Sequence, residues 1–372
     1  DCGEGGEDDE EHGTITIDLG SGDEDDEDDD EGYARKIFAI QRMFMERGMA
    51  VRDPNEGPRE NLLSSFDMQG VAELISSGKA RKIIVISGAG ISVSAGIPDF
   101  RSPGTGLYDN LQKYNLPDPQ AVFDLSYFRE SPDPFYMLAK ALYPGNFHPT
   151  PTHHFVNLLH KKGLLLRNFT QNIDTLEREA HVPAEKLVEA HGSFGDAHCI
   201  EPECRRHHEA DWVREHVFRE LIPFCLSCGG LVKPDIVFFG ERLPDKFFDC
   251  VQEDLPTCDL LIVLGTSLTV QPFASLVDRV GSDCPRLIVN REVPRGARPD
   301  PIMRMLGLQQ GFELDPEYNY RDACFLGNCD EGVRELSRLL GWEEELEALV
   351  AARQAHPLND WVPSESFAPS PL

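Results

Sequence analysis

The sequence predicts an α/β protein with a doubly wound, mostly parallel, Rossmann-like sheet into which two smaller modules are inserted. Apolar runs such as Ile83–Ile86 and Asp259–Leu264 are typical of strands that are buried on both faces of a parallel sheet. From residue 82 to residue 340 these runs alternate with helical patterns and loops, as in βαβ connections. Two close cysteine pairs between residues 199 and 228 interrupt the alternation and indicate a small zinc-binding module.

The first 60 residues differ in composition from the rest of the chain. Residues 1–32 contain 17 Asp or Glu and no Lys or Arg, which accounts for more than half of the net charge of −30. Like charges at this density repel one another and bury nothing, so we expect a solvated tail, with a docking arm for basic partners as the alternative. An amphipathic helix is expected at Ala34–Met49, before a main domain at 61–350 and a loose tail at 351–372.

Composition also disfavours several classes of protein. The chain has 372 residues, of which 40% are hydrophobic, and this is enough for a large core. No apolar run approaches the ~20 residues of a membrane span, so no membrane association is expected. Direct binding of nucleic acid needs clustered Lys and Arg, which the acidic balance disfavours. Disulfides are the poorer expectation for ten cysteines in a long chain with no visible secretory signal.

The stretch Lys82–Arg101 joins the first strand to a glycine-rich turn. Gly88-Ala89-Gly90 follows the strand at once, and such a turn lets backbone N–H groups approach a phosphate. The spacing departs from the dinucleotide fingerprint G-x-G-x-x-G, because Val93 stands where the third glycine belongs. An ordinary nicotinamide-cofactor oxidoreductase is therefore disfavoured. Gly96–Arg101 then brings together a carboxylate, an aromatic ring and a guanidinium, which alone would indicate a capped surface turn.

Two further strands end in polar residues. Leu164–Phe169 runs into Thr170–Asp174 at the carboxyl end of a strand, where parallel sheets bind ligands, although turn chemistry alone also explains these residues. Leu187–Ala190 ends at His191-Gly192. An isolated histidine is usually structural, but this one stands at a strand end beside a glycine that would leave room for substrate. Histidine titrates near neutral pH and can relay a proton.

The zinc prediction rests on four cysteines with matching spacing: Cys199, Cys204, Cys225 and Cys228. Four thiolates fill a tetrahedral ion and leave no position for water, so the site would be structural rather than that of a zinc hydrolase. A zinc ribbon that binds nucleic acid is the competing interpretation, which the acidic residues between the pairs disfavour. We place the module at about 195–232, with His198, His207 and His208 on its loop surface.

The remaining segments complete the predicted domain. Aromatic residues at helical spacing, broken by prolines, predict a helical module at about 102–163. Val232–Glu241 is expected to resume the main domain as strand and loop. Arg286–Glu292 repeats the pattern of an apolar strand with a polar end, and Tyr320–Gly327 is expected to be the last strand, before a helix at Glu331–Leu340.

Six of these motifs, in this order, closely resemble the sirtuins, a family of NAD-dependent protein lysine deacylases. The resemblance covers roughly residues 62–350 and adds two segments to those already quoted, Val237–Glu241 and Gly265-Thr266-Ser267. Within the family, Ser102–Leu111 and Tyr320–Trp342 are most similar to the cytosolic, tubulin-deacetylating sirtuin branch of animals. The acidic tail at 1–32 departs from that pattern.

The resemblance implies roles for individual residues. His191 would be the catalytic base, and Asn172 and Asp174 would order the ribose and the nicotinamide pocket. Val237, Phe238, Phe239, Gly240 and Glu241 would pair with the substrate backbone by β-augmentation. Contacts with NAD would come from Gly88, Ala89, Gly90, Ile91, Ser92, Val93, Asp99, Phe100, Arg101, Gln171, Asn172, Ile173, Asp174, Gly265, Thr266, Ser267, Asn290, Arg291, Glu292 and Cys329. Most of the family carries Lys where Arg291 stands, so the charge at that position is kept.

The function implied by the resemblance is NAD-dependent removal of acyl groups from lysines of proteins such as histones or tubulin, in the cytoplasm or the nucleus. NAD would be consumed as a cosubstrate, giving nicotinamide and O-acyl-ADP-ribose, and one Zn²⁺ would be structural. Two alternatives remain open. A mono-ADP-ribosyltransferase of the same family would carry the same motifs. A non-catalytic, zinc-stabilised binding scaffold would be favoured by loss of the His or Asn motif, and both motifs are present.

Overall fold

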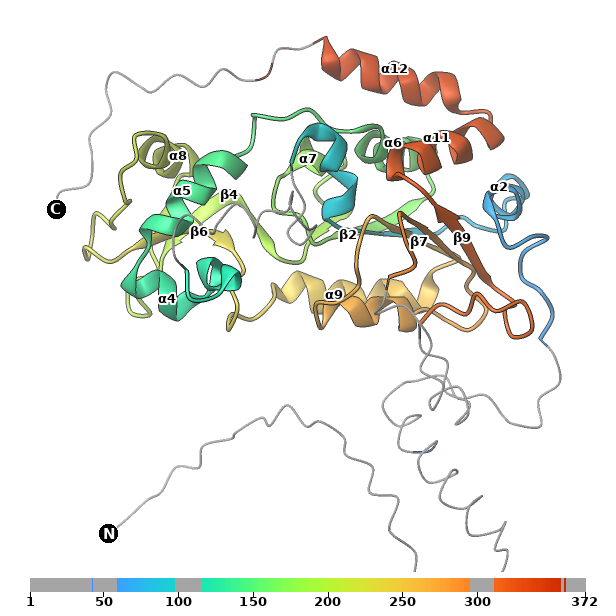
Figure 1. Cartoon of the computed structure of the whole chain (residues 1–372), viewed down its shortest axis with the longest axis horizontal. Coiled ribbons are helices and arrows are strands. Elements are labelled where there is room, and N and C mark those ends of the chain that lie inside the picture. Colours follow the sequence, from blue (N-terminus) through green and yellow to red (C-terminus); the bar gives the residue numbers. More distant parts are fainter. Residues whose placement is uncertain (1–41, 43–58, 98–115, 295–310, 356–357, 359–372) are drawn as a thin grey trace, which may run out of the picture.

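Six strands form one parallel sheet in the order β3-β2-β1-β7-β8-β9 (Figure 1). The computed structural model describes residue 42, residues 59–97, 116–294 and 311–355, and residue 358. Every neighbouring pair in the sheet is parallel. The strands are β1 (Ile83–Ser87), β2 (Leu165–Thr170), β3 (Leu187–Glu189), β7 (Leu260–Leu264), β8 (Arg286–Asn290) and β9 (Asp322–Leu326). The predicted Rossmann-like class is confirmed, and the strand order reverses between β1 and β7.

Helices cover both faces of this sheet, which explains why its strands are apolar throughout (Figure 1). Successive side chains of a strand point to opposite faces, so Ile83 and Val85 pack into one core while Ile84 and Ile86 pack into the other. The first core is covered by α2 (Met68–Ser76), α6 (Pro151–Lys161), α11 (Cys329–Leu339) and α12 (Glu343–Gln354). The second is covered by α9 (Asp245–Asp254) and the 3₁₀ segments η5 (Leu255–Thr257) and η6 (Phe273–Asp278).

Polar side chains mark where the covering helices begin. Asp67 precedes α2 and accepts hydrogen bonds from the backbone N–H groups of Gln69 and Gly70. Asn328 precedes α11 and forms a capping box with Glu331. The predicted start of this helix at Glu331 is therefore two residues late, because Glu331 is the third residue of the first turn.

A second, smaller region contains a three-stranded antiparallel sheet in the order β5-β4-β6. Its core is aromatic, with Phe128, Phe135 and Phe238 packed edge to face. The strands are β4 (Gly192–Cys199), β5 (His207–His208) and β6 (Val232–Ile236). The helices are η4 (Pro119–Phe123), α4 (Leu125–Glu130), α5 (Asp133–Leu142) and α8 (Ala210–Phe218).

Two expectations about this smaller region are wrong. Val232–Glu241 does not return to the main sheet, because β6 pairs with β4 instead. The three histidines predicted on a loop surface lie on strands, with His198 on β4 and His207 and His208 on β5, and His208 is buried. A two-residue strand is too short to give a sequence pattern, which explains the second miss.

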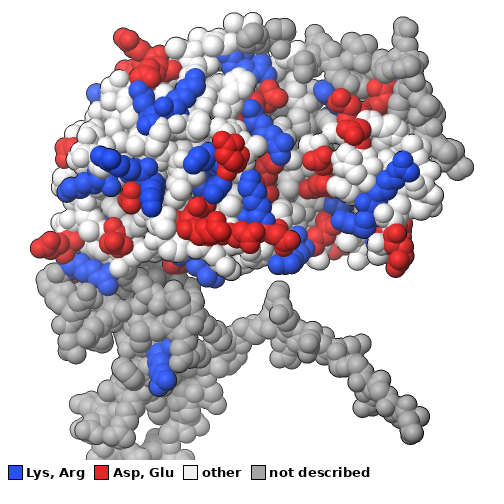
Figure 2. Space-filling model, turned by 180° about the vertical axis from the view of Figure 1, so that it is seen from behind, with Lys and Arg blue, Asp and Glu red and all other residues white. Residues whose placement is uncertain are grey.

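The ends of the chain are only partly covered by the structure. The acidic tail and the predicted helix at Ala34–Met49 lie outside the described residues, apart from Arg42. No helix within the described ranges is long and apolar enough to cross a membrane. On the face shown in Figure 2, the basic and acidic side chains of the described residues are interspersed.

Candidate active site

The loops after β1 and β7 meet at the carboxyl edge of the large sheet, at the point where the strand order reverses. Gly90 N–H donates to the carbonyl of Gly265 at 2.8 Å, and Gly88 N–H donates to that of Leu264 at 3.1 Å. A Cβ on Gly90 would lie 2.7 Å from the Cα of Gly265, and one on Gly88 would lie 2.7 Å from the Cβ of Thr266. Only glycine permits this approach, and the crevice at such a point is where open α/β sheets bind ligands.

A buried polar pocket lies beside these loops. Ser92 Oγ donates to Asp174 Oδ2 at 2.6 Å. Asn172 Nδ2 donates to the carbonyl of Gly88 at 3.2 Å and to Ser92 Oγ at 3.3 Å. The structure therefore brings four of the residues predicted to contact NAD together across the ends of β1 and β2. Asp99, Phe100 and Arg101 were also predicted to contact NAD and lie outside the described residues.

A second carboxyl group, Glu177 on the short helix α7 (Leu176–Glu179), lies next to Asp174 and was missed from the sequence. Oxygens of Asp174 and Glu177 and a ring nitrogen of His153 all lie within 4.8 Å of one another, and all three residues are buried. Burial raises the pKa of Asp174, and burial together with the nearby Asp174 raises that of Glu177 to about 8. The pair therefore holds a proton at neutral pH. No pattern in the sequence marks Glu177, which stands in an ordinary helical turn.

Gln171 connects the ends of three strands and carries an unused donor. Its N–H donates to the carbonyl of Ser87 at 3.0 Å, and its Oε1 accepts from Thr266 Oγ1 at 3.3 Å. Its Nε2 is buried and has no hydrogen-bond partner among the described residues. A buried donor without an acceptor is costly, so this atom fits a ligand oxygen in the pocket.

His191 lies at the carboxyl end of β3, where the large sheet leads into β4. Its Nδ1 lies 3.1 Å from the carbonyl oxygen of Gln171. A carbonyl can only accept, so Nδ1 carries the proton and Nε2 is left unprotonated in the neutral ring. Burial lowers the pKa of His191 below its usual 6.5, which keeps the ring neutral at pH 7. The arrangement leaves one ring nitrogen able to accept a proton.

Gly192 has a different purpose from the one expected. It was predicted to leave room for substrate, but a Cβ at this position would lie 1.8 Å from the carbonyl oxygen of Asp235. Its φ of +68° is also unfavourable for other residues. The glycine therefore admits the neighbouring strand β6, which fixes the position of His191 next to it.

The ends of β7, β8 and β9 carry the other residues predicted to contact NAD. Asn290 Nδ2 donates to the carbonyl oxygens of Thr266 at 3.3 Å and Glu292 at 2.8 Å. Arg291 Nε donates to Asn328 Oδ1 at 3.0 Å. Cys329 is buried, with its Sγ 3.6 Å from the carbonyl of Val289. These contacts form one continuous edge, and Asn328 is a member that the sequence did not reveal.

The segment Val237–Glu241 lies beside His191. Val237 N–H donates to the carbonyl of His191 at 2.9 Å, and Phe239 N–H donates to that of Phe123 at 2.8 Å. Phe239 is 43% exposed, and no described atom would contact a Cβ on Gly240. Among the described residues, no hydrogen bond engages the N–H of Gly240. The segment therefore offers exposed backbone next to the candidate base.

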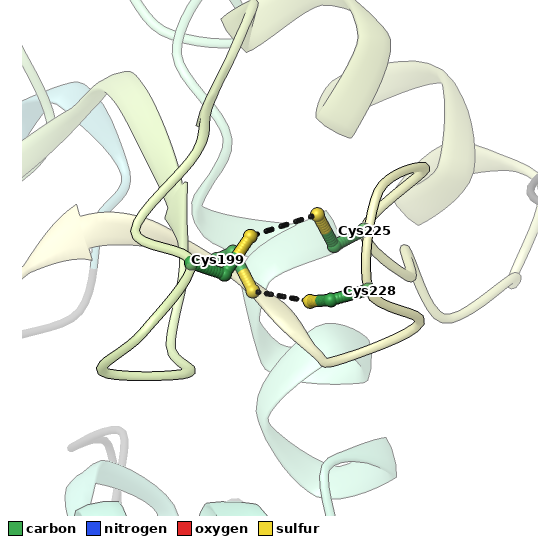
Figure 3. Close-up of side chains that lie close together, drawn as sticks. Cys199, Cys225 and Cys228 are labelled. Atoms are coloured by element: carbon green, nitrogen blue, oxygen red, sulfur yellow. Dashed lines mark hydrogen bonds between the residues drawn. The ribbon is translucent and has the colours of Figure 1, made fainter.

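The four predicted metal ligands converge in the smaller region, and Figure 3 shows Cys199, Cys225 and Cys228 among them. The Sγ atoms of Cys199 and Cys228 are 3.4 Å apart, and those of Cys204 and Cys225 are 3.6 Å apart. All four sulfurs lie within 4.8 Å of one another. Zn–S bonds of 2.3 Å in a tetrahedron separate the sulfurs by about 3.8 Å, so the donor set fits a structural zinc ion. A Cβ on Gly230 would lie 3.2 Å from Cys199 Sγ, which explains the glycine there.

Comparisons with known proteins agree with this geometry. The Sir2 family model matches residues 88–272. "NAD-dependent protein deacetylase sirtuin-2" of Danio rerio is 51% identical over 314 residues, which cover 84% of this chain and 82% of that protein. The chain belongs to the Sir2 family. "NAD-dependent protein deacetylase hst2" of Schizosaccharomyces pombe is 50% identical over 287 residues, covering 77% and 80% of the two chains. "NAD-dependent protein deacetylase sirtuin-3" of Mus musculus is 48% identical over 281 residues, covering 76% and 78%.

Proposed function

We propose that this Sir2-family chain is an NAD-dependent protein lysine deacetylase. The observation that carries the proposal is the position of His191. Its Nδ1 is held by the carbonyl of Gln171, and its backbone carbonyl binds Val237, so the ring lies between the polar pocket and the exposed segment. Relatives that share about half of their residues with this chain are named as deacetylases of this kind. The catalytic domain corresponds to residues 61–350.

His191 acts as the general base through Nε2. The lowered pKa keeps the imidazole neutral, and the carbonyl of Gln171 fixes the tautomer, so that Nε2 can take a proton from a hydroxyl group brought next to it. NAD, when bound, supplies the ribose carbon to which the acyl oxygen is transferred and the hydroxyl groups that His191 deprotonates. One water is consumed when the amide bond is broken, and the products are nicotinamide, free lysine and O-acyl-ADP-ribose.

The polar pocket holds the nicotinamide end of NAD. Asn172, Asp174 and the buried Nε2 of Gln171 orient the ribose and the ring, and the glycine turn Gly88-Ala89-Gly90 lines the place of the diphosphate. Asn290, Arg291 and Glu292 hold the adenosine end, next to Cys329. Because Asn172 and Asp174 are buried and bonded to Ser92, they need no rearrangement to meet the ligand.

The segment Val237–Glu241 receives the acyl-lysine chain, whose backbone meets the exposed part of the segment at Phe239 and Gly240. Its exposed edge suits many sequences, because the bonds go to backbone groups. We propose acetylated histones or tubulin as protein substrates and a cytoplasmic or nuclear place of action. Zn²⁺ on Cys199, Cys204, Cys225 and Cys228 is structural, because four thiolates complete its coordination.

The test is an assay by mass spectrometry on an acetyl-lysine peptide, with and without NAD. Deacetylation that requires NAD and gives equal amounts of nicotinamide and O-acetyl-ADP-ribose supports the proposal. Folded, zinc-loaded protein that leaves the peptide acetylated in the presence of NAD contradicts it. Transfer of ADP-ribose to protein instead of loss of acetyl would favour the transferase alternative.

A further inference from the structure

We propose that Lys233 is a positioning residue for the acyl-lysine peptide, because its ammonium group fixes the shape of the substrate segment Val237–Glu241. The inference rests on the proposed function in one respect, namely that this segment receives the substrate backbone. Lys233 lies on β6, four residues before the segment begins.

The side chain of Lys233 is buried. Only 7% of its side chain is exposed, yet the ammonium group meets four partners. Nζ lies 3.0 Å from Glu241 Oε2 and donates to the carbonyls of Ile236 at 2.5 Å and Pro234 at 3.2 Å. It also lies 4.3 Å from the centroid of the Phe238 ring, within the range of a cation–π contact. All of these partners lie between residues 234 and 241, so the lysine closes a loop on its own strand end.

The contacts of Lys233 with Glu241 also fix the path of the backbone after β6. Glu241 Oε2, which pairs with Lys233, also accepts from the N–H of Phe238 at 2.8 Å. The N–H of Glu241 donates in turn to the carbonyl of Phe238 at 3.0 Å. The chain therefore turns at Phe238–Glu241 rather than continuing as a strand, and this turn leaves Phe239 and Gly240 exposed.

A gain in folding stability does not explain why a lysine occupies this buried position. Burying a charged pair is costly, and replacing such a pair by apolar residues of similar size is often neutral or stabilising. Desolvation accordingly lowers the pKa of Lys233. A methionine could fill the same space against Phe238. A methionine cannot bind the carboxylate and the two carbonyls, whereas the ammonium group binds all three at once and so sets the geometry of the segment beside His191.

The test compares Lys233→Met with wild type in steady-state assays on an acetyl-lysine peptide. We expect the KM for the peptide to rise about tenfold, with kcat and the KM for NAD within about twofold of wild type. Lys233→Arg should restore part of the peptide affinity, since a guanidinium can bind the same acceptors. Lys140→Met is the matched control, because Lys140 forms an exposed pair with Glu220 at 2.8 Å and should leave every constant unchanged.

A second variant keeps the test decisive if Lys233→Met does not fold. Lys233→Met with Glu241→Gln removes both charges and leaves an amide oxygen to accept from Phe238, so it should fold and still bind peptide more weakly. A peptide KM that stays within twofold in either folded variant overturns the inference. So does a loss in which kcat and the KM for NAD change together with the melting temperature, because that result indicates a purely structural role.

Binding of the labelled acetyl-lysine peptide to NAD-free protein, measured by fluorescence anisotropy, separates this inference from the proposed function. If wild type binds the peptide without NAD-dependent turnover, the proposed function fails while weaker binding by Lys233→Met still supports the role of Lys233. If wild type turns over the peptide and the variant binds it equally well, the proposed function stands and the inference fails. If wild type neither binds nor turns over the peptide, both fail.

Discussion

The large parallel sheet and the small antiparallel region are stabilised by different means. The strands β1 and β7 are buried along their whole length, and helices cover both of their faces. The small region has strands of two to eight residues, a core of aromatic rings packed edge to face and four converging thiols. Burial of apolar area is enough to stabilise the large sheet. A sheet as small as the second would gain folding free energy from a structural ion bound to the thiols. His191 and Gly192 lie where the two regions join.

The two ends of the strands in the large sheet also differ in how their buried charged groups are paired. At the amino ends of β8 and β9, the buried Arg286 forms a bidentate pair with Asp322, at 2.7 Å and 2.6 Å, and also donates to the carbonyls of Val277 and Gly311. At the carboxyl ends, the buried carboxyl groups of Asp174 and Glu177 face each other without a cation among the described residues around them. The charge of Arg286 is matched inside the fold, whereas a pair of buried acids with no cation beside it is typical of sites that bind ligands.

The largest expected effect is the loss of activity when His191, which lies where the two regions meet, is replaced. His191→Ala should lower kcat at least about a hundredfold, because general-base catalysis contributes about 10²–10⁴-fold. NAD binding and the melting temperature should change little, since the ring makes one side-chain hydrogen bond, to Gln171. Deacetylation assays and NAD titration by calorimetry measure the two quantities. His160→Ala, on α6, is the control, and a variant at position 191 that retains half of its activity would contradict the role as base.

The second effect tests whether the small region depends on zinc. Cys225→Ala should release the ion and lower the melting temperature by about 10 °C, which corresponds to roughly 6 kcal/mol for a domain of this size. Elemental analysis and differential scanning calorimetry give the metal content and the transition. Cys324→Ala removes a half-buried thiol of β9, far from the cluster in sequence, and should keep the zinc. Equal zinc content and melting temperature in both variants would show that the four thiols need no metal.

The difference between the two regions also explains how far the sequence could predict them. The large sheet follows from runs such as Ile83–Ile86, because a strand buried on both faces leaves an unmistakable apolar pattern. The cysteine cluster was predicted because thiolate ligands have characteristic spacing. The strand β4 was missed, since its Gly192–Cys199 stretch mixes polar, aromatic and small residues. Glu177 was missed because two acids three residues apart are common on an exposed helical turn. Only their burial in the folded chain raises the pKa of Glu177.

The third effect concerns the uncompensated acids and depends on pH. The pKa of Glu177 is raised to about 8 in the folded chain from its ordinary value of 4.5. Between these values the folded state binds a proton that the unfolded state has lost, so this group makes stability fall as pH rises from about 4.5 to about 8. Glu177→Gln mimics the protonated form and should remove that loss. Its melting temperature should match wild type near pH 5 and exceed it by several degrees near pH 8.

Melting curves at half-unit steps of pH check this expectation. Glu335→Gln, which changes an exposed partner of Arg338 on α11, serves as the matched control and should run parallel to wild type. A profile for Glu177→Gln that is also parallel to wild type would show that the two acids are compensated by groups outside the pocket described above. The acids at the carboxyl ends of the strands would then be matched in charge, like Arg286 and Asp322 at the amino ends.

The smallest effect is expected where the sequence is most extreme. Removing residues 1–32 takes away 17 acidic groups, yet kcat and KM on a short neutral acetyl-lysine peptide should stay within about twofold. A segment of like charge has no apolar surface to bury, and salt at 0.15 M screens its field beyond about 8 Å. Steady-state assays at low and physiological salt measure the change. A fivefold loss of kcat that persists at high salt would mean that the tail contacts one of the two regions. Residues 1–32 would then contribute to the active site together with the large sheet and the small region.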